Sequence, residues 1–429
     1  MHPMTRRTFL SSATSVAALS LAQRAALAQV SANDKITIGI IGCGGMGLGD
    51  LNAFLANPDV DCAVVCDIDN ARMAQAADLV QGARGTRPEM VNDFRKVIDR
   101  ADVTALLVAT PDHWHALPAI YGCEAGKDVY VEKPLGKCIE EGRAMLEAMK
   151  KNNRVVQMGT QWRSAEHFRS AVEAVQSGKI GKVRLVRAWA YLDWVGGIGS
   201  PADGEPPAGV DYDLWLGPSP SRPFNPNRFH FNFRWFWDYA GGLMTDWGVH
   251  LINIVMWAMG PTPPNKITSY GGKRVIDDNT ETPDTQIAVY DFPEYTFIWE
   301  HQMLGGIGPG GKPHGISFTG SKGTLILDAD GWEIIPEPKN KELMPEKHTT
   351  NGDGRPQHVR NFLDCIKTRE QPVENLELAH FISTVAHLGN IALRTGETIV
   401  WDAANERCVG NHAANALASA NYRGPWKLT

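Results

Sequence analysis

The sequence predicts an α/β protein with a doubly wound parallel sheet, followed by a second domain built on an open, mostly antiparallel sheet. Over residues 34–159, buried-strand patterns alternate with helical patterns, which is typical of parallel βαβ units. Over residues 160–402, strand-like runs alternate apolar and polar side chains, which is typical of antiparallel strands with one wet face. The length of 429 residues exceeds one typical hydrophobic core and also favours two domains.

The composition argues against several classes of protein. A net charge of -6 gives no reason to expect nucleic acid or an anionic membrane surface as partner. After the first thirty residues, no apolar run is long enough to cross a bilayer, so we expect no membrane span. The seven cysteines form no CxxC pair, which argues against a thiolate zinc site.

The N-terminus has the pattern of an export signal. Arg6 and Arg7 stand in a charged start that precedes Phe9 and Leu10, an Ala-rich apolar stretch follows, and Ala26-Leu27-Ala28 matches a cleavage site. The paired arginines resemble a twin-arginine signal, so we expect residues 1–28 to be removed and the protein to be exported, to the periplasm or beyond, already folded. The alternative is an N-terminal helix that frays.

The first strand of the parallel sheet leads into a glycine-rich turn. Lys35–Ile41 is a buried-strand run, and a helical pattern follows the turn. Between them the G-x-G-x-x-G spacing predicts a loop whose backbone N–H groups approach a pyrophosphate at a helix N-terminus. The residues expected to bind the cofactor in this loop are Gly42, Gly44, Gly45, Met46 and Gly47.

The second strand distinguishes between the two nicotinamide cofactors. Asp61–Cys66 ends at Asp67, where a carboxylate would bond both adenosine ribose hydroxyls and repel a 2′-phosphate. NAD is therefore expected. Arg72 lies five residues on and could accommodate the phosphate, so NADP stays open.

Later strands of the first domain end in polar residues. Val103–Ala109 leads into Thr110-Pro111-Asp112-His113-Trp114-His115, and Asp128–Val131 leads into Glu132-Lys133-Pro134. A further strand, Arg154–Gly159, follows a helix. Because open α/β sheets bind ligands beyond the carboxyl ends of their strands, Lys133 is placed to touch a substrate. The alternative is an ordinary surface lysine that begins a loop.

The second half combines strands with one long loop. Residues 196–234 are rich in Gly, Pro and Asn, and a loop of that length in a compact domain is usually functional or an interface. We take residues 403–429 as a C-terminal tail. The strand-like runs are Lys182–Tyr191, Thr285–Phe292, Thr296–His301, Gly315–Thr319 and Gly323–Asp328.

Gly241–Asn253 has the pattern of a helix start. Asp246 and His250 stand four residues apart, so on one helix they would face the same way. A carboxylate and an imidazole on one face make an acid/base group with an orienting partner. A structural histidine is the equal alternative.

In combination, these motifs resemble the glucose-fructose oxidoreductase / inositol dehydrogenase / MocA family. The residues that match are the Gly42 loop, Thr110-Pro111 with His115, Glu132-Lys133-Pro134, and Asp246-x-Gly248-x-His250, in this order and over roughly residues 35–402. The resemblance implies a Rossmann domain and a C-terminal α/β domain whose open sheet often makes dimers or tetramers. It also implies that Lys133 and His250 flank the nicotinamide and the substrate.

Further site residues follow from the resemblance alone. It implies that the bond before Pro134 is cis and that Thr110, His115 and Glu132 line the cofactor. It also implies that Gln161 binds the cofactor and that Arg163 contacts the substrate.

The chemistry of a hydride transfer assigns roles to the catalytic candidates. His250 is the better base, because its ordinary pKa lies near neutrality. Lys133 would steady the developing alkoxide or relay the proton, and Asp246 would orient His250 or bind a sugar hydroxyl. A metal site at His113, His115, Asp246 and His250 is the alternative. A nicotinamide pocket already accounts for these residues, so we expect no metal.

The aromatic residues suggest a carbohydrate substrate. Seven of the thirteen tryptophans fall between Trp189 and Trp257. Aromatic faces stack on the apolar faces of sugar rings, although core packing is expected for at least half of these tryptophans. Trp237 and Tyr239, which precede the Asp246 segment, are our candidates for the substrate pocket.

The leading interpretation is an exported NAD(P)-dependent oxidoreductase acting on a hydroxyl of a sugar, polyol or glycoside. The cofactor is expected to stay bound, because it would be lost outside the cytoplasm. The glucose-fructose oxidoreductase of the family retains its cofactor with the help of a long N-terminal arm, whereas only residues 29–34 stand here between the signal and the first strand. A glycoside hydrolase that uses bound NAD for transient oxidation and elimination is the runner-up, and a non-catalytic sugar-binding protein is third.

Overall fold

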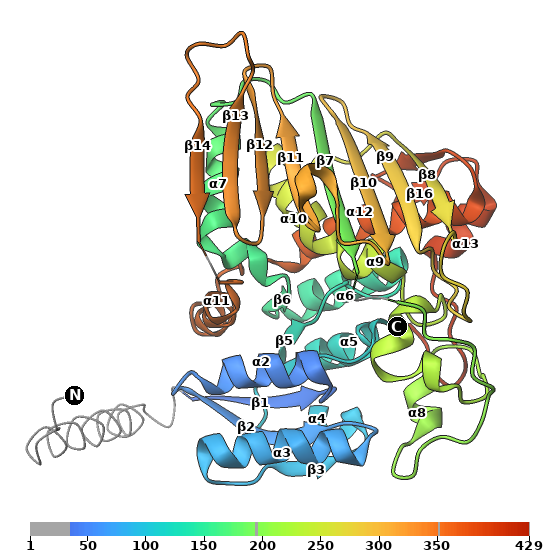
Figure 1. The fold of residues 1–429 in the computed structure, drawn as a ribbon. Helices are drawn as coiled ribbons and strands as arrows, with labels where there is room; N and C mark the ends of the chain where they lie inside the picture. The colour runs from blue at the N-terminus through green and yellow to red at the C-terminus, as the bar shows by residue number, and fades with distance from the viewer. Residues whose placement is uncertain (1–34, 194–195, 351, 429) are drawn as a thin grey trace, which may run out of the picture.

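The structure is a computed structural model that describes residues 35–193, 196–350 and 352–428. The expected signal peptide lies outside these residues. Within them, no helix combines the length and the apolar character that crossing a membrane requires. Two sheets dominate the molecule, one in each half of the chain (Figure 1).

The first sheet is parallel throughout, with strand order β3-β2-β1-β4-β5-β6. This is the doubly wound arrangement, so the predicted fold class of the first domain is confirmed. The short strand β3 was not predicted. The strands are β1 (Ile36–Ile41), β2 (Val60–Cys66), β3 (Glu89–Val91), β4 (Ala105–Val108), β5 (Asp128–Val131) and β6 (Val156–Met158).

Helices cover both faces of this sheet and separate its strands in the chain. Asp69 caps α3, because its carboxylate accepts a hydrogen bond from the backbone N–H of Ala71. The β1 and β4 residues are almost fully buried between the two layers. The helices are α2 (Gly45–Leu55), α3 (Asn70–Arg84), α4 (Phe94–Ile98), α5 (Ala116–Glu124) and α6 (Ile139–Asn152).

The second sheet has ten strands within the described residues, in the order β14-β13-β12-β11-β7-β10-β9-β8-β15-β16. Only β7 and β10 pair in parallel, which confirms the prediction of a mostly antiparallel sheet. The strands are β7 (Leu185–Leu192), β8 (Lys266–Gly272), β9 (Thr285–Asp291), β10 (Thr296–Met303), β11 (His314–Thr319), β12 (Gly323–Asp328), β13 (Gly331–Pro336), β14 (Glu346–Thr349), β15 (Ile399–Asp402) and β16 (Arg407–Cys408).

Three long helices pack together against one face of this sheet. α10 contacts both α7 and α12, and each of the three touches a strand (Figure 1). Their contacts bury the largest apolar cluster of the described chain, which includes Trp189, Trp299 and Phe318. The helices are α7 (Glu166–Gln176), α10 (Gly248–Met259) and α12 (Leu376–Thr395).

The two halves of the chain are interleaved. α11 (Arg355–Thr368) comes late in the sequence but lies beside α2 of the first domain (Figure 1). Its Phe362 ring packs edge-on against Phe54 and Tyr130, with ring centroids 6.1 and 5.8 Å apart. The core of the parallel sheet is therefore completed by residues from the second half.

Residues 403–428 are not a separate tail. β16 extends the second sheet beyond β15, and α13 (His412–Ala418) packs on α12. The chain then returns to the first domain, where the Trp426 ring meets Trp114 at 4.8 Å. A strand as short as β16 gives no readable sequence pattern, which is why the sequence indicated a tail.

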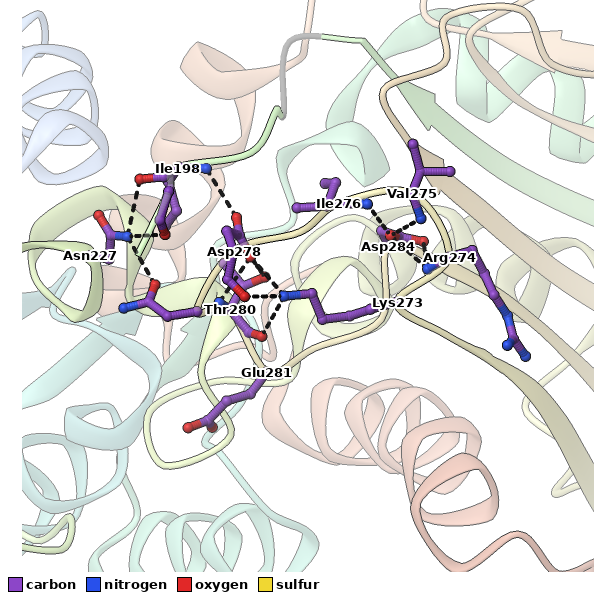
Figure 2. A network of polar contacts seen from close by, with 12 residues as sticks. Ile198, Asn227, Lys273, Arg274, Val275, Ile276, Asp278, Thr280, Glu281 and Asp284 are labelled. Atoms are coloured by element: carbon purple, nitrogen blue, oxygen red, sulfur yellow. Dashed lines mark hydrogen bonds and ion pairs between the residues drawn. The ribbon is translucent and has the colours of Figure 1, made fainter. Parts of the chain in front are cut away.

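The long loop predicted over residues 196–234 contains three short helices: α8 (Tyr212–Leu216), η4 (Pro226–Arg228) and η5 (His230–Trp235). Figure 2 shows how it is held against the turn after β8. Asp278 accepts hydrogen bonds from the Ile198 N–H at 2.9 Å and from Lys273 Nζ at 2.8 Å. Asn227 donates its side-chain amide to the carbonyls of Ile198 and Gly199. These bonds satisfy the backbone of a segment without regular structure.

Candidate active site

A cavity of about 350 Å³ lies at the carboxyl ends of β1, β2, β4 and β5. This is where an open α/β sheet binds ligands. One wall comes from the glycine turn and the strand ends of the first domain. The other wall comes from the long loop, through Leu214, Trp215, His230, Phe231, Phe233 and Arg234.

The glycine turn has the geometry of a dinucleotide cradle. Gly42 has a φ of +94°, a conformation that side chains disfavour. A Cβ at Gly47 would lie 2.1 Å from the carbonyl oxygen of Gly42, so the close approach of helix and turn requires glycine there. A Cβ added at Gly45 would meet nothing within 4 Å, so there is open space over the start of α2. The residues present therefore fit NAD, with its pyrophosphate at the α2 N-terminus.

Asp67 and Arg72 both line the same end of this cavity. The Asp67 carboxylate accepts hydrogen bonds from the backbone N–H of Cys43 at 2.6 Å and of Asp69 at 2.9 Å. Burial raises its pKa, although these two bonds oppose the rise. The carboxylate is thus fixed between the glycine turn and β2, where the sequence predicted the ribose contact.

Lys133 links the two domains at the other end of the cavity. It follows β5 and precedes a cis bond to Pro134, as the resemblance implied. Its Nζ donates to Asp246 Oδ1 at 2.6 Å and to the Asp246 carbonyl at 3.0 Å. The Lys133 side chain is only 7% exposed, so this ion pair is shielded from water.

Asp246 also accepts a hydrogen bond from Arg234 Nε at 3.1 Å. Burial alone would raise the pKa of Asp246, but the charges of Lys133 and Arg234 outweigh it and hold the pKa well below its usual range. The Arg234 guanidinium lies over the rings of Phe231 and Phe233, at 4.7 and 4.8 Å. Asp246 is therefore a permanent anion between two cations.

The Asp246–His250 segment differs from the predicted helix. Instead of one helix there are two, α9 (Gly242–Asp246) and α10, joined at Trp247. No hydrogen bond joins Asp246 to His250 in the described structure, so Asp246 holds Lys133 rather than orienting the imidazole. Spacing of four residues places side chains on one face only when the helix is continuous, and here it is not.

His250 lies in the first turn of α10, and the centre of its ring is 5.0 Å from that of Trp162. Its Nδ1 is buried and has no hydrogen-bond partner within the described residues. Burial lowers the pKa of His250 to about 3, and the charge of Lys133 adds to the effect while Asp246 opposes it. The imidazole is thus neutral at physiological pH and has a free nitrogen.

Three other predicted cofactor residues also line the cavity: Thr110, His115 and Glu132. The Thr110 hydroxyl is buried without a partner in the described part of the chain, which leaves it available to a ligand. His115 joins two strand ends, because its ring nitrogens lie 2.7 Å from the Pro134 carbonyl and 2.9 Å from the Thr110 carbonyl. Residues 35–193, 196–350 and 352–428 hold no cluster of three or more His, Cys, Asp or Glu side chains suited to a metal ion.

Seven predicted residues are not among those that line this cavity: Gly47, Gln161, Arg163, Trp237, Tyr239, Asp246 and His250. Gly47 lies behind the glycine turn, and Asp246 reaches the cavity through its ion pair with Lys133. Arg163 instead donates to Asn253 Oδ1 at 2.9 Å. Tyr239 is fully buried with its ring against Trp215 and His113, so it belongs to the core. Trp237 lines a separate cavity. The clustering of aromatic residues in the sequence carried no information on which way each one faces.

Sequence reasoning missed two titratable residues of the cavity, Arg234 and Asp112. Asp112 is buried beside the Lys133 end, and this burial raises the pKa of its carboxyl to about 8, against the charges of Lys133 and Arg234. Its place directly after Thr110-Pro111 was the available signal. No sequence signal pointed to Arg234, because its contact with Asp246 forms only when the chain has folded.

Comparison with known proteins agrees with this geometry. The profile described as an oxidoreductase family with an NAD-binding Rossmann fold matches residues 36–160. The profile of the C-terminal alpha/beta domain of the same oxidoreductase family matches residues 127–287 and 329–428.

Among curated relatives, a levoglucosan dehydrogenase of Pseudarthrobacter phenanthrenivorans is 30% identical over 175 residues, 39% of this chain and 44% of the relative. A glycosyl hydrolase family 109 protein of Saccharopolyspora erythraea is 33% identical over 166 residues, 38% of this chain and 36% of the relative. The aligned part of the chain thus spans less than half the length of these two relatives.

Solved structures show the same fold over most of the chain. A levoglucosan dehydrogenase in complex with NADH superposes with a TM-score of 0.68 at 18% identity, covering 85% of this chain and 98% of the other. Since both family profiles match and together cover most of the sequence, the chain belongs to the Gfo/Idh/MocA oxidoreductase family.

Proposed function

We propose that this protein is an NAD-dependent oxidoreductase that moves a hydride between the nicotinamide and a hydroxyl-bearing carbon of a sugar, polyol or glycoside. The observation that carries the proposal is the Lys133–Asp246 ion pair, whose lysine lines the inner end of a dinucleotide cavity. Neutral His250 feels the charges of both residues, although it is not itself among the residues that line the cavity. Bound NAD would supply the hydride acceptor. The glycine turn, Thr110 and Asp67 would hold it.

The residues of the chain divide the proton chemistry between them. A neutral imidazole with a free nitrogen can accept the hydroxyl proton of the substrate, so His250 serves as the base. The Lys133 ammonium has Asp246 on one side and can donate to the alkoxide that forms on the other. Asp246 is a positioning residue, which fixes the direction of Lys133.

The substrate class rests on relatives. Their names include levoglucosan dehydrogenase and inositol 2-dehydrogenase 2, the latter 33% identical over 155 residues. Both names describe dehydrogenases of a carbohydrate or a polyol. Three aromatic residues among those that line the cavity, Phe231, Phe233 and Trp215, supply apolar surface for a sugar ring.

The cofactor is retained, in this proposal, by the strap, which we define as residues 209–234. The Asn70 N–H donates to the Gly209 carbonyl at 3.2 Å, and the Asp211 N–H donates to the Ile68 carbonyl at 3.0 Å. His230 Nε2 lies 3.0 Å from Asp69. The strap thus crosses the cavity from the Asp67 end to the Lys133 end and takes the place of an N-terminal arm.

Export and self-association complete the proposal. The twin-arginine pattern supports export of a folded protein with its cofactor already bound. The face of the second sheet opposite the three helices carries exposed Tyr270 and Ile287, at 73% and 44%. Such a surface supports a homodimer or homotetramer.

A glycoside hydrolase is the second candidate. Several relatives carry the name glycosyl hydrolase family 109, one of them at 33% identity. Transient oxidation of a sugar hydroxyl acidifies the neighbouring C–H bond and permits elimination of the glycosidic group. That cycle needs the same base, His250, and the same cation, Lys133. It also fits a retained NAD, because the cofactor is restored at the end of each turnover.

One experiment separates the candidates. The mature protein is purified, any bound dinucleotide is identified, and the protein is incubated with free sugars and with chromogenic glycosides. A net change in NADH absorbance with free sugars supports the oxidoreductase. Release of the aglycone without net change supports the hydrolase. Absence of both bound nucleotide and turnover would overturn the two proposals together.

A further inference from the structure

A second cavity, of about 220 Å³, lies outside the cofactor site. It forms where the start of α6, the segment before α9, α12 and α13 meet, and it shares no lining residue with the first cavity. Its volume is below the roughly 300–1,000 Å³ of sites for drug-sized ligands, so it suits a compact metabolite. We call it the Arg394 cavity. It is lined by Lys137, Cys138, Pro220, Trp237, Asp238, Ala240, Gly241, His387, Asn390, Ile391, Arg394, Ala416, Leu417, Ser419 and Asn421.

Two cations line this cavity without a carboxylate partner. Neither Lys137 nor Arg394 forms an ion pair with any residue that the structure describes, but Lys137 Nζ donates one hydrogen bond to the backbone carbonyl of Asp238 at 3.2 Å. The Arg394 guanidinium lies 4.7 Å from the centre of the Trp237 ring. Partial burial lowers the pKa of Arg394 while the charges of Glu281 and Asp238 oppose this shift, although part of the side chain reaches solvent. Two cations and one carboxylate, that of Asp238, thus line the Arg394 cavity.

The acidic groups near these cations are engaged elsewhere. Asp238 is the one carboxylate among the lining residues, and it pairs with Arg222. Glu281, the other acidic neighbour of Arg394, accepts a hydrogen bond from the backbone N–H of Trp237 at 2.9 Å. The donors of Arg394 stay free for a ligand.

Asn390 provides a second and independent sign of a ligand. It is 5% exposed and lines the cavity from α12. Its Nδ2 donates to the Gly241 carbonyl at 2.7 Å, which fixes the side-chain amide. Its Oδ1 is buried and accepts no hydrogen bond in the described structure. Buried polar atoms are nearly always paired, so a donor is missing at this point.

We propose that the Arg394 cavity binds a small hydroxy acid, such as a sugar acid. Its carboxylate would lie between Arg394 and Lys137, which together supply charge-assisted donors. One of its hydroxyl groups would donate to Asn390 Oδ1. The Trp237 indole forms the wall beside the carbon chain. The proposal does not depend on the catalytic assignment, because Lys133, Asp246 and His250 do not line this cavity.

The test is isothermal titration of the purified protein, with its bound nucleotide, using gluconate as probe. We expect one site per chain. Acetate, which lacks the hydroxyls, and glucose, which lacks the carboxylate, should each bind at least tenfold more weakly. Gluconate that fails to bind, or that binds no better than acetate, would overturn the proposal.

Variants locate the binding. Arg394→Gln and Lys137→Gln should each weaken gluconate binding at least tenfold, whereas the exposed Arg274→Gln should leave it unchanged. Both Arg394 and Lys137 reach solvent, so their loss is compatible with folding, and circular dichroism checks this. Gluconate that binds all variants equally would lie elsewhere, for example in the catalytic cavity, and the proposal would be wrong.

Discussion

The two ends of the cofactor cavity are closed in different ways. At the inner end, Asp246 lies between Lys133 and Arg234, and the three charges are almost shielded from water. At the outer end, His230 contacts Asp69, but burial and the nearby Arg72 lower the pKa of His230 to about 4. That contact is therefore a hydrogen bond to a neutral ring at physiological pH. The difference indicates a rigid catalytic end and an outer end that can open.

The largest effect is expected from the inner end. Lys133→Ala and His250→Ala should each lower turnover by about two to four orders of magnitude, the usual contribution of general acid–base assistance. NAD binding should persist, because the glycine turn and Asp67 are untouched. Turnover and bound nucleotide are measured on the same samples. The exposed Lys96→Ala is the control for Lys133, and near-normal rates in either variant would contradict the assigned roles.

Removing the charge of Asp246 tests how firmly the inner end is held. Asp246→Asn leaves Lys133 and Arg234 without a counter-charge, so we expect a loss of about 3–5 kcal/mol in the free energy of unfolding. Denaturant titration measures it. Asp203→Asn is the matched control, because its pair with Arg228 is 43% exposed on the aspartate side and should cost at most about 1 kcal/mol. Equal losses of unfolding free energy in Asp246→Asn and Asp203→Asn would show that burial does not make the Asp246 ion pairs stronger than the exposed pair.

Acid should weaken the fold through the buried imidazole that fastens the strap. His113 Nε2 lies 2.9 Å from the Trp215 carbonyl, and burial lowers the pKa of His113 from 6.5 to about 3. Between these two pH values only the unfolded chain binds the proton, so stability is full above pH 6.5 and falls as the pH drops. The slope for one such group is about 1.4 kcal/mol per pH unit.

His113→Gln keeps a donor for the Trp215 carbonyl but cannot titrate. Its unfolding free energy, measured between pH 6.5 and 4.5, should fall less steeply than that of the unchanged protein, by about the slope of one group. The exposed His412→Gln should leave the slope as it is. Identical slopes for all three proteins would show that His113 is protonated in the folded state.

The smallest effect is expected at the outer end. His230→Ala removes one partly exposed hydrogen bond between the strap and the Asp69 carboxylate, worth about 0.5–1.5 kcal/mol, so NADH should dissociate roughly two to ten times faster. Loss of NADH fluorescence after dilution measures the rate. His348→Ala on β14 is the control. An unchanged rate in His230→Ala would mean that the strap does not limit release.

The features that could be predicted from the sequence are those that short, local patterns encode, namely the strands of the parallel sheet and the residues at their ends. Strands β1, β2, β4 and β5 are apolar runs. They are followed by the glycine turn, Asp67, Thr110 and Lys133 respectively, and each of these features predicts a contact with the cofactor or the substrate. The contacts made by the strap, which includes Arg234, are different, because they join separate segments of the chain. Trp237 and Tyr239 do not line the cofactor cavity as expected, because the direction in which an aromatic side chain points is set by tertiary packing. The break at Trp247 also left no sign in the helical pattern.

The position of α11 has a consequence for the order of events during synthesis. Val359, Phe362 and Leu363 belong to the same apolar cluster as Ile38 and Phe54 of the first strand and helix. The ribosome must add about 200 residues after the first domain before this cluster is complete, which takes roughly 10–40 s at typical rates of synthesis. The nucleotide cradle therefore matures late, when most of the second sheet has already been made.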